Sequence, residues 1–192
     1  MSNLAYNIDY EERYEIIEGV KTIMSPSPTW IHGTIDSTLV MIFKNYCRKN
    51  KCGLVFGDNI DVHLPDGNLF MPDISVVCDR NILKNGGTIY GVPDLIVEIL
   101  SKSTAKNDFG AKKDAYERNG VKEYWIVNPI DKSVQVYHLI DSKFKLDYIY
   151  HIYTPVELEQ LSEEKLAEIK YEIKVSIFDD LIVDVADVFY DI

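Results

Sequence analysis

Two carboxylates interrupt segments that otherwise have the apolar composition of buried β-strands. Asp73 follows a proline and precedes the apolar run 74–77, and Glu98 lies inside the apolar run 95–100. Burying a lone carboxylate costs several kcal/mol, so such a group normally has a cation, hydrogen-bond donors or a metal ion beside it. The chain must therefore fold so that both carboxylates are compensated, and their position on neighbouring strands favours a divalent-metal site.

Length and composition predict one globular domain spanning residues 1–192. The chain is 46% hydrophobic and 27% charged, which is ordinary for a soluble domain of this size. Its three cysteines, Cys47, Cys52 and Cys78, form no CxxC pair, so we expect reduced thiols and neither disulfides nor structural zinc. The N-terminus lacks the pattern of a signal peptide and no run is long enough to span a membrane, which predicts a cytoplasmic protein without membrane contact.

The net charge of −11 argues against binding nucleic acid by bulk electrostatics, because phosphate contacts normally use Lys and Arg. The distribution of charge weakens this objection. Six basic residues cluster after the second acidic strand: Lys102, Lys106, Lys112, Lys113, Arg118 and Lys122.

The first half of the chain predicts two hairpins separated by a long helix. Residues 14–24 alternate around Glu18-Gly19, and apolar positions recur at helical spacing from Thr29 to about Asn50, with His32 on the inward stripe. Residues 57–64 and the turn 65–68 predict a second hairpin, whose returning strand runs through Asp73 to Val77.

The second half predicts strands alternating with helices. After the strand that ends at Leu100 and a polar loop, the patterns predict a helix over about 108–119, strands over 123–127 and 134–139, a helical segment over 154–170 and a final apolar run over 181–185. The predicted fold is therefore α/β, with a central mixed sheet that carries Asp73 and Glu98 and is flanked by helices.

A third charged residue is predicted to face these carboxylates. On one continuous helix, Phe109, Lys112 and Tyr116 share a face, which directs Lys112 inward between two aromatic rings. The nearest negative charges would then be those at the end of the preceding strand.

Asp73, Glu98 and Lys112 together resemble the active site of the PD-(D/E)XK nuclease superfamily, and the flanking sequence resembles its Uma-type restriction endonucleases. The matching segments are Glu18-Gly19, residues 25–27, His32, residues 71–77, 92–104, Asp108, Tyr116 and 120–129. Two positions depart from the pattern. Leu100 stands where the superfamily has its lysine, so Lys112 is taken as a migrated lysine, and Lys102 replaces an expected proline.

The resemblance implies a restriction-endonuclease-like fold and metal-dependent hydrolysis of DNA phosphodiester bonds. Asp73, Glu98 and the carbonyl of Ile99 would hold Mg²⁺ or Mn²⁺, and Lys112 would orient the attacking water or stabilise the charge on the phosphate. His32, Ser101 and Asp108 would be accessory residues. DNA binding should be weak and dependent on metal, and a homodimer is expected because cutting both strands of a duplex takes two sites.

Other interpretations of these residues stay open at this stage. Asp73 can cap a turn, Glu98 and Lys112 can form a buried structural ion pair, and His32 can be a support residue of the core. Lys102 or Lys106 can replace Lys112 in the site. The alternative function is a catalytically inactive nuclease fold that acts in protein interaction or dimerisation, and binding of Mg²⁺ or Mn²⁺ separates the two.

Overall fold

A mixed six-stranded sheet forms the centre of the molecule. The computed structural model describes residues 13–24, 29–57, 60–84, 86–101 and 104–192. In spatial order, the central sheet consists of β12 (Lys143–His151), β11 (Ser133–Ile140), β10 (Glu123–Asn128), β9 (Leu95–Ile99), β6 (Ile74–Val77) and β3 (Leu54–Phe56). β9 and β10 are parallel and the other pairs are antiparallel, which confirms the predicted mixed sheet.

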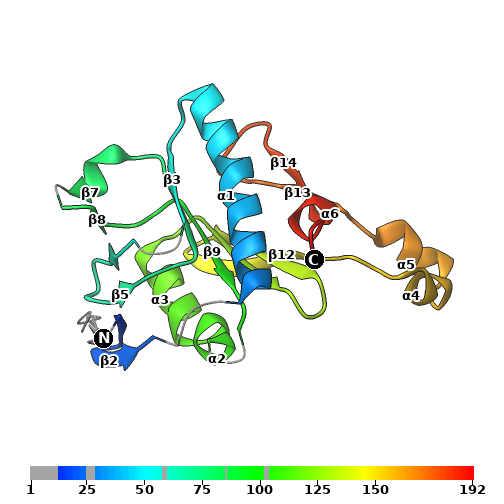
Figure 1. Cartoon of the computed structure of the whole chain (residues 1–192), viewed down its shortest axis with the longest axis horizontal. Coiled ribbons are helices and arrows are strands. Elements are labelled where there is room, and N and C mark those ends of the chain that lie inside the picture. Colours follow the sequence, from blue (N-terminus) through cyan, green and yellow to red (C-terminus); the bar gives the residue numbers. More distant parts are fainter. Residues whose placement is uncertain (1–12, 25–28, 58–59, 85, 102–103) are drawn as a thin grey trace, which may run out of the picture.

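The central sheet is covered on both faces, which explains the unbroken apolar runs of its middle strands. One face, with Val97 and Trp125, packs against the long helix and the C-terminal elements, and the opposite face carries Ile96 and Ile126. Figure 1 shows α1 and α3 on either side of β9 in this view. The covering elements are α1 (Trp30–Asn50), α3 (Ala111–Asn119), β13 (Glu172–Lys174), β14 (Ile182–Asp184) and α6 (Val185–Val188).

A second six-stranded sheet, which the sequence patterns did not predict, is built from short strands on the α3 side. Its order is β2 (Val20–Ile23), β1 (Tyr14–Ile17), β5 (Leu69–Phe70), β4 (Val62–His63), β8 (Thr88–Tyr90) and β7 (Leu83–Lys84), with the short helix η1 (Arg80–Ile82) before β7. The hairpin at Glu18-Gly19 is confirmed, and both turn residues have positive φ, at 51° and 80°.

The strand expected to run through Asp73 to Val77 is wrong as a single element. β5 belongs to the second sheet and β6 to the central sheet, and the chain changes sheets across residues 71–73. Pro72 lies in this connection, where the backbone N–H that proline lacks is not needed for a ladder. The break leaves Asp73 directly before β6 and outside both strands.

The long helix α1 is confirmed. Thr29 caps its N-terminus by accepting a hydrogen bond from the backbone N–H of His32, and Lys51 ends it in a left-handed conformation. Its buried stripe repeats at helical spacing and consists of Ile35, Leu39, Phe43 and Cys47.

The single helix predicted over 108–119 is wrong, because two helices occupy this region. α2 (Ala105–Phe109) begins three residues earlier than expected and ends at Gly110, whose φ and ψ of −113° and −111° interrupt the helical path before α3. Phe109 therefore ends α2 with an exposed side chain and does not flank Lys112, which corrects the predicted shared face.

The helical segment predicted over 154–170 is also divided. Thr154 and Glu157 form the expected capping box at α4 (Pro155–Glu159), and Ser162 caps a second helix, α5 (Glu163–Glu168). Figure 1 shows both helices projecting away from the sheets. Within the described ranges, no helix combines the length and apolar character that a membrane span requires.

Candidate active site

The two carboxylates singled out in the sequence come together at the junction of β6 and β9. These strands pair antiparallel with Ile74 opposite Val97, so Asp73, directly before β6, continues the register toward Glu98. Side chains opposite each other on adjacent strands project from the same face of a sheet. Both carboxylates therefore lie on the face that α3 covers.

Asp73 is held by contacts to both of its oxygens. Its Oδ2 accepts a hydrogen bond from the backbone N–H of Ile99 at 2.6 Å, and its Oδ1 lies 3.1 Å from Nε2 of His32. The side chains of Asp73 and His32 are 16% and 13% exposed, so this end of the cluster is in contact with solvent. His32 therefore lies beside Asp73, and its accessory role stays a prediction.

Glu98 is buried and its two contacts involve the same oxygen. Oε1 accepts hydrogen bonds from Nζ of Lys112 at 3.1 Å and from the hydroxyl of Tyr116 at 2.8 Å. Within the described residues no hydrogen bond or ion pair involves Oε2. The sequence correctly placed Tyr116 beside Lys112 but gave no indication that its hydroxyl would hold Glu98.

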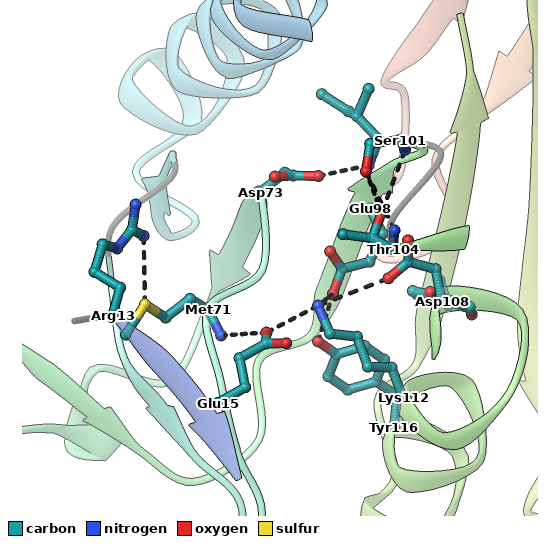
Figure 2. A network of polar contacts seen from close by, with 12 residues as sticks. Arg13, Glu15, Met71, Asp73, Glu98, Ser101, Thr104, Asp108, Lys112 and Tyr116 are labelled. Atoms are coloured by element: carbon teal, nitrogen blue, oxygen red, sulfur yellow. Dashed lines mark hydrogen bonds and ion pairs between the residues drawn. The ribbon is translucent and has the colours of Figure 1, made fainter. Parts of the chain in front are cut away.

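Lys112 lies at the centre of a buried ionic network, which Figure 2 shows from close by. Its Nζ is 2.9 Å from Glu15, 3.1 Å from Glu98 and 3.7 Å from Asp108. The predicted approach to Glu98 is confirmed. The aromatic ring near the ammonium, at 5.8 Å, is that of Phe70.

Glu15 is the residue that sequence reasoning missed. It is buried on β1, and its Oε1 accepts a hydrogen bond from the backbone N–H of Met71 at 3.1 Å besides pairing with Lys112. It thus joins Lys112 to the connection that carries Asp73. One signal was present in the sequence: strand alternation puts Glu15 on the same face as the buried Ile17.

Asp108 is the most buried carboxylate of the cluster, and it contacts Lys112 one helical turn away across the α2–α3 junction. Neither of its oxygens has a hydrogen-bond partner within the described part of the chain. Burial raises the pKa of Asp108 to about 6, against the opposing charge of Lys112.

Burial also dominates the titration of the other groups. It raises the pKa of Glu98 well above the usual range, against the opposing charge of Lys112 and with the help of Asp108 and Asp73. The pKa of Lys112 is also raised: burial lowers it, but Glu98, Glu15 and Asp108 together outweigh burial. The expectation of a raised carboxylate pKa is confirmed, although like-charge crowding is the smaller cause.

Ser101 organises the turn between β9 and α2. Its hydroxyl lies 3.0 Å from that of Thr104, its N–H donates to Thr104 Oγ1, and its carbonyl accepts from Ala105. It therefore positions the start of α2. Lys102, the alternative lysine, and the motif residues 25–27 lie outside the described residues; Lys106 is exposed on α2.

The donor set of the cluster fits a hard divalent cation. Four carboxyl groups, from Glu15, Asp73, Glu98 and Asp108, face one lysine and one histidine, so acidic groups outnumber basic groups in the cluster. Carboxylate and carbonyl oxygens are the ligands that Mg²⁺ and Mn²⁺ prefer. Among the described residues no three His, Cys, Asp or Glu side chains converge on one metal position.

Comparison with known proteins relates the chain to nuclease-like proteins. The family described as "Uma2: Putative restriction endonuclease" matches residues 3–175. An uncharacterized protein of Synechocystis sp. is 28% identical over 141 residues, covering 73% of this chain and 74% of that protein. The fold is similar to that of a crystal structure described as "a putative nuclease belonging to DUF820" from Anabaena variabilis, with a TM-score of 0.65, 19% identity, and coverage of 94% of this chain and 91% of the other.

Proposed function

The chain belongs to the family described as "Uma2: Putative restriction endonuclease", and we propose that it is a metal-dependent endonuclease that hydrolyses the phosphodiester bonds of DNA. The observation that supports this proposal most is the pairing of β6 with β9, which brings Asp73 and Glu98 to one face of the sheet beside a buried lysine. Four carboxylates against so few cations are difficult to explain as a structural network alone, because each buried charge left uncompensated costs stability.

In this proposal Asp73, Glu98 and the carbonyl of Ile99 hold Mg²⁺ or Mn²⁺. When bound, the ion lowers the pKa of a coordinated water and neutralises charge on the scissile phosphate. His32 and the N–H of Ile99 fix the orientation of the Asp73 carboxylate. The Tyr116 hydroxyl and Lys112 do the same for Glu98 through Oε1.

Lys112 has a second role in the proposal. Three carboxylates raise the pKa of Lys112, which favours its charged form. Lys112 therefore supplies a positive potential beside Glu98, which favours the negative charge that accumulates on a phosphate during hydrolysis. We further propose that a homodimer supplies the two sites needed to cut both strands.

The test is nicking of supercoiled plasmid by the purified chain. Nicks should form only with Mg²⁺ or Mn²⁺ and only at low ionic strength, because a protein with a net charge of −11 binds DNA weakly and salt screens the few favourable contacts. Glu98→Ala should abolish nicking. The fold should survive, because Lys112 keeps Glu15 and Asp108 as partners; Asp73, the partner expected from the sequence, pairs with His32 instead.

A matched control is Glu117→Ala, which removes a carboxylate on α3 that pairs with Lys143 away from the cluster. It should nick at the rate of the unmodified chain. Absence of nicking under every metal and salt condition, together with unfolding of Glu98→Ala in circular dichroism, would favour the other function.

That other function is a catalytically inactive nuclease fold serving in protein interaction or dimerisation. The observation in its favour is the burial of Lys112. Its side chain is 4% exposed and surrounded by three carboxylates, as expected of a structural ion network. Isothermal titration with Mn²⁺ separates the two functions, since only the endonuclease requires a bound cation.

A further inference from the structure

A surface groove runs along the C-terminal half of α1, away from the cluster of carboxylates. It has a volume of about 790 Å³ and lies between α1, β3 and Arg80. Val40 and Leu54 contribute apolar surface to it. Four cations line it, Lys44, Arg48, Lys51 and Arg80, against one carboxylate, Asp36.

This groove is basic in a protein that carries eleven excess negative charges. The four cations are exposed, and none of them forms an ion pair with a carboxylate in the described parts of the chain. Three of the basic residues that the sequence placed near the active site differ in this respect. Lys112 is buried among carboxylates, Arg118 pairs with Asp66, and Lys122 pairs with Asp94.

We infer that this groove binds the phosphate backbone of the DNA substrate at a distance from the cleaved bond. The inference rests on the proposed function, and it specifies where the DNA duplex runs over the surface beyond the site of cleavage. His32, beside Asp73, stands near the start of α1, and the helix rises about 1.5 Å per residue. Lys44 and Lys51 therefore lie about 18 and 28 Å further along the axis, which corresponds to about 5 to 8 base pairs.

The spacing of the cations favours a polyanion over a single phosphate group. Lys44, Arg48 and Lys51 follow each other at intervals of four and three residues, or about 6 and 4.5 Å along the helix axis. A strand of duplex DNA presents one charge about every 3.4 Å of its axis. A row of cations spread over about 10 Å of the helix axis can reach several phosphates of one strand, whereas one small anion would reach only one or two of the cations.

The experiment measures binding separately from cleavage. Fluorescence anisotropy with Ca²⁺ in place of Mg²⁺ follows binding of a duplex of roughly 30 base pairs over a salt series. The double substitution Lys44→Gln/Arg48→Gln should weaken binding about 10-fold or more and lower the slope of log K against log salt by about 1.8, because two phosphate contacts are lost.

The control, Lys49→Gln/Lys174→Gln, removes the same net charge from exposed positions that do not line the groove. It should change the slope by much less. Equal losses in both double variants, or no loss in the groove variant, would overturn the inference. Plasmid nicking assayed in parallel tests the proposed function separately. If the chain never nicks but DNA affinity falls only in the groove variant, the groove is a DNA-binding site and the proposed nuclease function is wrong.

Discussion

Asp108 is a buried carboxylate whose charge the fold compensates incompletely. Its oxygens are buried and accept no hydrogen bond from the described residues, and Lys112, at 3.7 Å, also serves Glu15 and Glu98. A carboxylate in such a position binds a proton more tightly in the folded chain than in the unfolded chain. The ionised form of Asp108 is consequently a source of strain in the cation-free protein.

Replacing Asp108 by Asn should stabilise the cation-free protein at neutral pH. The pKa rises from 3.8 to about 6 on folding, so the wild-type chain is relatively most stable below pH 3.8 and loses that advantage as the pH rises through 6. At pH 7.5 in EDTA the gain should be on the order of 2–3 kcal/mol, and it should vanish near pH 4. Thermal unfolding of both proteins across this pH range measures the difference.

Asp179→Asn, at an exposed position, serves as the control and should leave the melting temperature unchanged at both pH values. A lower melting temperature for Asp108→Asn at pH 7.5 would show that its attraction to Lys112 outweighs its desolvation.

The residues of the cluster were predictable to different degrees. Three residues of the cluster can be recognised from the sequence, because each is a charged residue at a position that the local pattern predicts to be apolar or inward-facing. They are Asp73, Glu98 and Lys112. Glu15 cannot be recognised in this way, because its partner Lys112 is remote in sequence and the contact depends on how the second sheet docks. The hydroxyl of Tyr116 was hidden for a similar reason: a tyrosine on a buried face is usually explained by packing alone.

Among the elements, the break between α2 and α3 determines which side chains reach the cluster. Gly110 interrupts the helical path, so that Asp108 lies in the last turn of one helix and Lys112 in the first turn of the next. A Cβ atom at position 110 would lie 2.9 Å from the carbonyl oxygen of Lys106, closer than side-chain carbons pack. The junction is therefore restricted to glycine by a close approach of the backbone.

Gly110→Ala should destabilise the protein by about 1–3 kcal/mol and reduce any nicking, because relief of the clash moves α2 and Asp108 relative to Lys112. Chemical denaturation and the plasmid assay measure the two effects. Gly33→Ala is the matched control: it lies in α1 with no atom within 4 Å of the added Cβ, and it should stabilise by up to about 1 kcal/mol. Equal stability of the two variants would show that the junction tolerates a side chain.

Sequence patterns located long elements better than divided ones. α1 was predicted nearly to its ends because its apolar stripe and its cap are local features. The divisions at Gly110, at residues 160–162 and at 71–73 were missed, since each depends on packing against another element. The second sheet was missed for the same reason, because strands of two to four residues are too short to show a period.

At the scale of the whole molecule, stability should be unevenly distributed. α4 and α5 contain no buried residue, whereas residues 123–127 of β10 are all buried. Amides of α4 and α5 should therefore exchange with solvent at least about 1000-fold faster than those of β10. Hydrogen–deuterium exchange measured at two protein concentrations provides the test. Slow exchange in the two helices that disappears on dilution would instead identify them as the interface of a homodimer.

The contact between Glu15 and Lys112 determines when during folding the candidate site is complete. Glu15 emerges early in synthesis and Lys112 much later, and contacts between segments so distant in sequence form late in folding. A nascent chain thus carries Asp73 before the residues that complete its surroundings exist. Under the proposed function, only molecules in which the first hairpin has docked against the fully assembled central sheet would cleave DNA.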